Sequence, residues 1–119
     1  MYGLPKDIDL RFLEQNELQN ISVGKYAVIL NFEAEITMTI QSRFVCSVDE
    51  RSKVVDEKLP SSASGMLALV GDRVIKADGC ANGTLKLTFS SGEYLVVYDD
   101  DPNYESYVIT RAGNTVVVV

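Results

Sequence analysis

The chain has 119 residues, 46% of them hydrophobic and 24% charged, with a formal net charge of −6 at pH 7. This length fits a single domain, residues 1–119. We expect no membrane segment because no apolar run reaches ~20 residues. We also expect a cytoplasmic protein because the N-terminal residues do not resemble a signal peptide. Its 11 basic residues never stand side by side and are outnumbered by 17 acidic ones, which excludes the clustered positive charge that nucleic-acid binding requires.

The first predicted element is a short helix within the first 16 residues. Ile8, Phe12 and either Gln15 or Leu13 fall at near-helical spacing, and Asp7 can serve as the N-cap. From Glu17 onward the hydrophobic pattern changes to a period of two, which indicates β-strands.

Alternating hydrophobic residues predict strands through the rest of the first half. Val28, Leu30 and Phe32 share one face of a strand at 26–32. After a turn at 33–35, one alternating phase runs through 36–48, which predicts one long strand or two collinear strands. The mixed charges at 49–58 indicate a solvated loop or a frayed strand end that links the two halves.

The second half begins after the strand-breaking segment 60–65, and residues 63–70 predict one or two helical turns closed by Gly71. Glycine-containing turns then delimit strands, which we expect near 73–78, 84–90, 93–99, 105–111 and 115–119. In the strand at 84–90, Leu85, Leu87 and Phe89 share one face, which predicts a sheet with one buried and one solvent-exposed face. The continuously apolar residues 116–119 predict a strand that is covered on both faces or paired centrally.

The two halves of the chain repeat one pattern, over about 17–48 and 71–99. Each half contains a strand, a turn, an alternating strand that ends in Phe, a tight turn and another strand. We therefore predict a mainly β fold (β-rich α+β) of two related antiparallel meanders, forming a sandwich or half-open barrel with one or two short helices. Phe32 and Phe89 should occupy equivalent buried positions.

The absence of histidine restricts the possible chemistry. Without histidine there is no Ser-His or Cys-His nucleophile pair, and the two cysteines alone do not make a usual zinc site. We interpret Cys46 and Cys80 as buried, reduced, apolar residues; a disulfide or a reactive thiol is the alternative. Carboxylate pairs such as Glu33 with Glu35, or Glu93 with Asp99, lie beside turns and do not indicate a glycosidase. We expect no enzyme, no cofactor and no metal.

The densest acidic segment lies at 99–105, between two predicted strands. It has three interpretations: a calcium site, a solvated turn, or a loop that faces another protein. Calcium is disfavoured because the spacing, central glycine and closing glutamate of an EF-hand are missing. Acidic groups flanked by Tyr98, Tyr104 and Tyr107 combine charge with rigid contact area, which is typical of a protein interface.

The segment Tyr104-Glu105-Ser106-Tyr107-Val108-Ile109, after the strand at 92–99, resembles an element of small bacterial β-rich domains. The Val-Gly step at 70–71 and the second valine at Val74 are similar to those domains as well. Some domains of this shape resemble immunity proteins of polymorphic toxin and contact-dependent growth inhibition systems. The resemblance covers the chain from about Leu18 onward, and the first half departs from it where Glu17 and Leu18 replace a glycine-containing turn.

The resemblance and the acidic composition together favour an immunity protein that binds a cognate bacterial toxin domain, such as a ribonuclease or other nuclease, and blocks its active site. The expected toxin contacts are Asp99, Asp100, Asp101, Tyr104 and Glu105, with Glu33 and Glu35 as second choice. We expect a monomer or weak homodimer. The alternatives are a non-enzymatic structural domain that self-associates through its edge strands and, third, a ligand-binding barrel.

Overall fold

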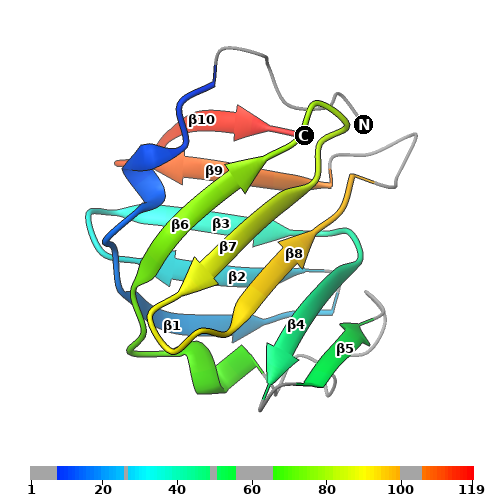
Figure 1. Ribbon diagram of the computed structural model, residues 1–119. Helices are drawn as coiled ribbons and strands as arrows, with labels where there is room; N and C mark the ends of the chain where they lie inside the picture. The colour runs from blue at the N-terminus through cyan, green and yellow to red at the C-terminus, as the bar shows by residue number, and fades with distance from the viewer. Residues whose placement is uncertain (1–7, 26, 49–50, 56–65, 100–105) are drawn as a thin grey trace.

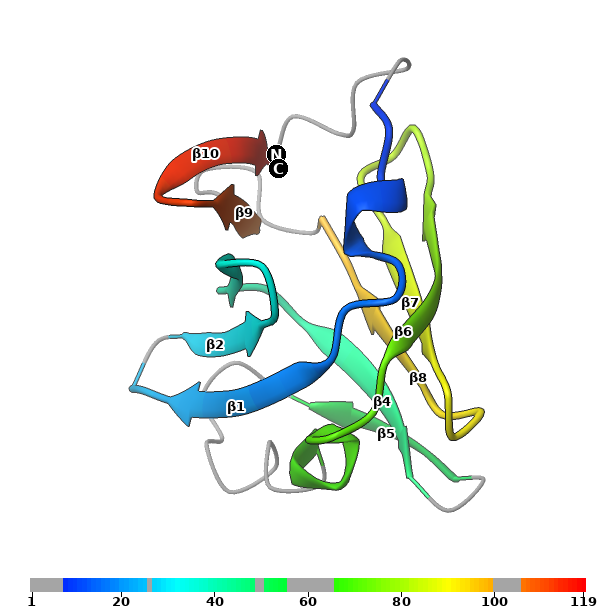
Figure 2. The same ribbon diagram turned by 90° about the vertical axis from the view of Figure 1, so that its left-hand side faces the viewer.

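The computed structural model describes residues 8–25, 27–48, 51–55, 66–99 and 106–119, which form two five-stranded sheets that face each other (Figures 1 and 2). The first sheet has the order β1-β2-β3-β9-β10 and the second the order β5-β4-β8-β7-β6. All neighbouring strands pair antiparallel. The strands are β1 (Leu18–Val23), β2 (Val28–Phe32), β3 (Ile36–Ile40), β4 (Phe44–Val48), β5 (Arg51–Val55), β6 (Val74–Gly79), β7 (Leu85–Phe89), β8 (Tyr94–Val97), β9 (Tyr107–Arg111) and β10 (Asn114–Val118). The predicted mainly β fold is confirmed.

Both predicted helices are short 3₁₀ turns instead of α-helices. The turn η1 (Arg11–Leu13) precedes β1, and residues 66–69 form the same structure before β6. A residue with a left-handed backbone follows each turn, namely Gln15 (φ 70°) and Gly71 (φ 96°). This conformation ends the helical hydrogen bonding and directs the chain into the next strand.

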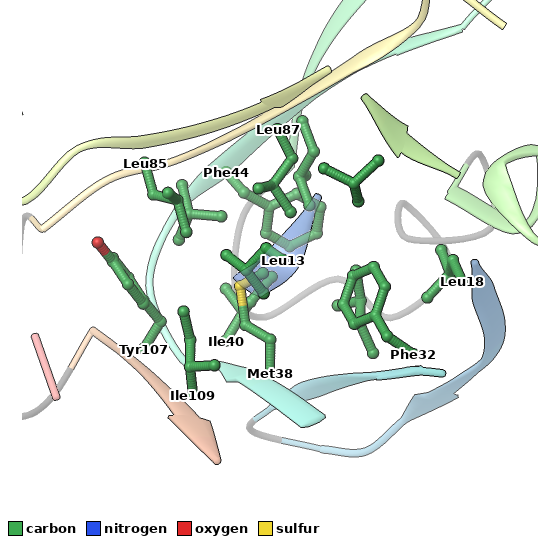
Figure 3. Packing of buried hydrophobic residues seen from close by; sticks show 14 of the residues in the cluster. Leu13, Leu18, Phe32, Met38, Ile40, Phe44, Leu85, Leu87, Tyr107 and Ile109 are labelled. Carbon is green, nitrogen blue, oxygen red and sulfur yellow. The ribbon is translucent and has the colours of Figure 1, made fainter. Parts of the chain in front are cut away.

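The core lies between the two sheets because alternate residues of the strands point inwards. In β2 and β3 every second residue is buried, and β7 has the same alternation. Figure 3 shows Met38 and Ile109 of the first sheet on the opposite side of this core from Leu85 and Leu87 of the second. Burying one such side chain contributes about 1.5–3 kcal/mol, so this shared core is what holds the sheets together.

The strands β1 to β5 correspond in order to β6 to β10. When each strand is replaced by its equivalent, the order of the first sheet becomes β6-β7-β8-β4-β5, which is the order of the second sheet. The registers agree as well: Leu18 lies opposite Phe32, and Val74 lies opposite Phe89, each followed by a β-bulge. Phe32 and Phe89 are both buried, which confirms the prediction that they occupy equivalent positions.

Each repeat completes the sheet of the other. The hairpin β4–β5 of the first repeat pairs with β8, and the hairpin β9–β10 of the second repeat pairs with β3. The prediction of a single or collinear strand at 36–48 is therefore wrong, since β3 and β4 belong to different sheets. The alternating pattern did not reveal the change because Ile40, Ser42 and Phe44 all stay buried while the chain crosses between the sheets.

Two other predictions about strands are corrected. The charged segment predicted as a solvated loop or a frayed strand end contains a complete strand, β5, which pairs with β4; residues 49–50 and 56–58 lie outside the described residues. The C-terminal strand β10 is an edge strand, not a central or doubly covered one. Val117 and Val119 face the core, but Val116 lies at an irregularity of the register and is 43% exposed.

Candidate functional site

The connection between β8 and β9 is the clearest difference between the repeats. Three residues, 41–43, join β3 to β4, whereas nine residues, 98–106, join the equivalent strands β8 and β9. The ends of both connections are bonded in the same way, since Tyr98 N donates to Arg43 O at 3.1 Å and Gln41 N donates to Ser106 O at 2.8 Å. The longer connection is therefore an addition to a pattern that otherwise repeats.

Most of the predicted toxin contacts belong to this connection. Asp100, Asp101, Tyr104 and Glu105 lie outside the described residues, and the structure places Asp99 at the start of the connection. Asp99 is half-buried, and its Oδ1 accepts a hydrogen bond from Ser106 Oγ at 3.0 Å. Because Ser106 closes the connection, this bond joins its two ends.

Gly83, in the turn between β6 and β7, packs directly against Asp99. A Cβ atom on Gly83 would lie 2.5 Å from Asp99 Cβ and 2.7 Å from its Oδ2, and Gly83 also has a φ of 95°. A residue without a side chain is thus required both by the close approach and by the left-handed backbone. Asp99 is wedged between Gly83 and Ser106, so it positions the connection.

Tyr107 follows Ser106 and is completely buried, so its expected role as exposed contact area is wrong. Its hydroxyl donates to the carbonyl oxygen of Gly83 at 2.7 Å. Burial raises the pKa of the Tyr107 hydroxyl above its ordinary value, with a smaller contribution from the nearby Cys80 thiol. The hydroxyl therefore stays protonated and keeps donating. We call Gly83, Asp99, Ser106 and Tyr107 the loop base.

The roles of Gly83 and Ser106 in the loop base were not predicted from the sequence. Asn82-Gly83 was recognisable as a turn, but its packing against Asp99 joins the β6–β7 turn to the connection that crosses between the two sheets, so it depends on the tertiary structure. Tyr98, the other tyrosine at this end of the connection, is half-buried, and the guanidinium carbon of Arg43 lies 5.1 Å from its ring centroid.

Glu33 is engaged within the fold. Its Oε1 accepts hydrogen bonds from Glu17 N at 2.8 Å and from Arg73 Nη1 at 2.7 Å. Arg73 Nη1 also donates to the carbonyl oxygen of Gln15 at 2.7 Å. Glu33 therefore links the turn after β2 to the starts of both repeats, and its contacts are those of a structural residue.

Glu35 is exposed and has a left-handed backbone with φ 59°. Its carbonyl oxygen accepts a bond from Ala112 N at 3.0 Å, which joins two neighbouring turns of the first sheet. In Figure 1 the turn between β2 and β3 is at the left, and the end of β8 is at the right. The structure therefore does not bring Glu33 and Glu35 together with Asp99.

Both cysteines are free, in agreement with the expected reduced state. Cys46 is buried as predicted, but Cys80 is exposed just after β6, so its predicted burial is wrong. Burial raises the pKa of the Cys46 thiol to about 11, and the negative charge of Glu93 contributes. The Cys46 thiol is thus an inert, apolar member of the core.

Carboxylates beside turns are bound within the fold at a second place as well. Glu93 Oε2 accepts a hydrogen bond from Ser47 Oγ at 2.6 Å, and the same Oγ accepts one from Tyr94 N at 2.8 Å.

Within the described ranges, no three His, Cys, Asp or Glu side chains gather in a way that could hold a metal ion. The same residues include no helix with the length and hydrophobicity needed to span a bilayer.

The fold and the loop base define a two-sheet, all-β domain built from two repeats, with an acidic addition in the second. The chain belongs to the family described as "Family of unknown function (DUF6188)", which matches residues 10–119. The match begins at Leu10, the buried residue just before η1, and therefore includes both repeats. No curated protein and no solved structure shows significant similarity to the chain.

Proposed function

We propose that this protein is a non-enzymatic binding domain that uses the connection between β8 and β9 to bind a basic surface of another protein. More specifically, it acts as an immunity protein that covers the active site of a bacterial toxin domain such as a ribonuclease. The observation that carries the proposal is the extended connection, nine residues against three, at a position where the two repeats otherwise match strand for strand. Additions of this kind to a regular scaffold are frequent sites of binding.

The composition of the connection supports a basic partner. It contains three consecutive aspartates followed by Tyr104 and Glu105, in a chain with a net charge of −6. Acidic groups of this density accelerate association with a positively charged surface, and a tyrosine adds rigid, amphipathic contact area. A nuclease active site is commonly basic because it binds phosphates, so it matches this segment electrostatically.

The loop base supports a positioned connection. Asp99 and Ser106 hold its two ends together, and Tyr107 fixes the adjoining strand to Gly83. Fixed ends reduce the conformational entropy that is lost when a loop binds its partner. In this proposal Asp99 positions the connection, and Asp100, Asp101, Tyr104 and Glu105 form the contact. Glu33 is structural, and the exposed Glu35 is a secondary contact.

The test compares two variants that change the net charge equally. Asp100→Asn with Asp101→Asn removes two charges from the connection, and Asp9→Asn with Asp78→Asn removes two exposed charges elsewhere. The probe is the toxin domain encoded beside this gene, with protection of growing cells and association rates at low and high salt as measurements. The first variant should associate roughly tenfold more slowly and lose salt dependence, while the second should behave like wild type.

Equal protection and equal rates for both variants would place the interface elsewhere on the domain. If the neighbouring genes encode no toxin, the immunity role is wrong. In that case the binding role is tested with an immobilised D100N/D101N protein and the wild type, each used to retain basic proteins from a lysate of the source cells.

A further inference from the structure

The outer face of the first sheet carries an uncharged row of polar side chains across all five strands. The paired registers place these outward residues side by side in the order Asn20, Asn31, Thr37, Thr110 and Thr115. Asn31 Nδ2 donates to Asn20 Oδ1 at 2.6 Å, and Thr37 Oγ1 donates to Asn31 Oδ1 at 3.2 Å. The side chains of this row are thus held in place by one another.

A second row beside it is also uncharged. Its members, one on each strand, are Ser22, Ile29, Thr39, Val108 and Val118. Most residues of the two rows are β-branched, and such side chains have few rotamers to lose when a partner covers them. The face is therefore both uncharged and rigid. We call the two rows together the neutral face.

The equivalent face of the second sheet is charged. The registers of β6 and β7 match those of β1 and β2, and they put Lys76 where the first sheet has Asn20, Asp78 where it has Ser22, and Lys86 where it has Ile29. The same backbone therefore accepts charges at these positions. Their absence from the first sheet is not imposed by the fold.

We propose that the neutral face is the contact surface of a homodimer, in which the first sheets of two copies pack face to face. Each copy has a net charge of −6, so two copies repel each other least where the approaching surfaces carry no charge. Hydroxyl and amide groups both donate and accept hydrogen bonds, so a face rich in them can pair with itself across a two-fold axis. A charged partner would find no complementary group on it.

The dimensions of the face predict a weak dimer. Five strands spaced ~4.8 Å apart and about five residues long give a projected area of roughly 400 Å². A standard stable interface buries about 800 Å² of accessible surface on each partner, so this contact belongs to the small, reversible class. The dimer should therefore form in a concentration-dependent way and leave the connection between β8 and β9 free for another partner.

The test transfers the charges of one repeat to the other. The triple variant Asn20→Lys, Ser22→Asp and Ile29→Lys gives the neutral face the charges that the second sheet already carries, and it makes the net charge less negative. A loss of association therefore cannot come from increased overall repulsion. The matched control is Thr88→Lys, which adds one positive charge to the outer face of the second sheet.

Sedimentation equilibrium from about 10 μM to about 1 mM protein provides the measurement. The average mass of the wild type and of T88K should rise towards twice the monomer mass, more strongly at high salt because salt screens the repulsion between copies. The triple variant should remain a monomer with an unchanged circular dichroism spectrum. If the triple variant unfolds, Thr39→Lys replaces it with the same expectation.

Three results would overturn the proposal: a wild type that stays monomeric at the highest concentration, a triple variant that associates like the wild type, or a T88K variant that loses association equally. High salt strengthens this dimer but weakens the proposed toxin contact. The two proposals therefore fail in distinguishable ways.

Discussion

Glu17 and Arg73 form an antiparallel bridge where the two repeats meet. The two residues are equivalent, since Glu17 directly precedes β1 and Arg73 directly precedes β6. The bonds on either side are reciprocal, with Leu18 N donating to Asp72 O at 2.9 Å and Val74 N donating to Asn16 O at 3.0 Å. The bridge therefore lies on the local two-fold axis that relates the repeats.

The two side chains of this bridge also differ in a way that breaks the symmetry. Arg73 pairs with Glu33, whose equivalent in the second repeat is Ser90, and Ser90 Oγ accepts a bond from Arg73 N at 3.1 Å. Glu33 Oε1 accepts the corresponding bond from Glu17 N. Equivalent backbone groups thus find equivalent partners, but only one of the two acceptors is charged and placed to hold an arginine.

Truncating either repeated phenylalanine should destabilise the protein strongly. Phe32→Ala and Phe89→Ala should each lower the free energy of unfolding by about 3–5 kcal/mol, because both side chains are buried in the core. Urea denaturation gives the measurement, and the outward-facing Thr88→Ala, which should change it by less than about 0.5 kcal/mol, is the control. A loss below about 1 kcal/mol at either phenylalanine would show that the residue is not part of the shared core.

The pair Glu33 and Arg73 should contribute modestly through its charges. Both side chains are partly exposed, so a double-mutant cycle of Glu33→Gln and Arg73→Ala should give a coupling energy below about 1 kcal/mol. Glu33→Ala should cost about 1 kcal/mol more than Glu33→Gln, because glutamine keeps an oxygen that accepts the bond from Glu17 N. Equal costs for the two substitutions would argue against that bond.

Gly83→Ala should be more destabilising than Gly92→Ala. Both glycines have a left-handed backbone, with φ values of 95° and 92°, so both substitutions introduce backbone strain. Only at Gly83 would the new Cβ also collide with Asp99, since nothing lies within 4 Å of a Cβ on Gly92. We expect the difference to be about 1–3 kcal/mol in thermal or urea unfolding. Equal losses would mean that Asp99 moves away freely.

The two cysteines should differ in reactivity. In the native protein a thiol reagent should label the exposed Cys80 rapidly and Cys46 only after unfolding, because the thiolate is the reactive form and Cys46 is buried with its pKa raised to about 11. Mass spectrometry of protein labelled at neutral pH separates the sites. Rapid labelling of both thiols would contradict the burial of Cys46.

The raised pKa of Cys46 also predicts a dependence of stability on pH. The unfolded thiol ionises at its ordinary pKa of 9.0, while the folded thiol keeps its proton up to about pH 11. In that interval the unfolded state binds fewer protons, so stability should fall as the pH rises from 9 to about 11. Cys46→Ala should flatten this part of the profile in urea titrations, and Cys80→Ala should not. Identical profiles for the two variants would contradict the prediction.

The strands of the second half and the internal repeat could be predicted from the residue pattern alone. Alternating residues such as Leu85, Leu87 and Phe89 specify a strand with one buried face, because successive side chains point to opposite sides of a sheet. Glycine-containing turns marked the strand boundaries of the second half. The two phenylalanines were matched correctly because each one ends the alternating strand of its repeat.

The pairing of the strands, and the acidic residues that remain free to contact a partner, depend on how the chain folds in three dimensions. The hydrophobic residues alternate with a period of two whether the chain stays in one sheet or crosses to the other at Ser42. The exchange of hairpins between the repeats could therefore not be predicted from the hydrophobic pattern. In the sequence, Glu33 and Asp99 are both acidic residues beside turns. Arg73 binds Glu33 because the two repeats pack together, and Ser106 binds Asp99 because the chain turns back between them. Hydrophobic periodicity reports which residues of one strand are buried. Strand pairing, the crossing of the chain between sheets and the formation of ion pairs depend on contacts between segments that are distant in the sequence, so they could be identified only in the folded protein.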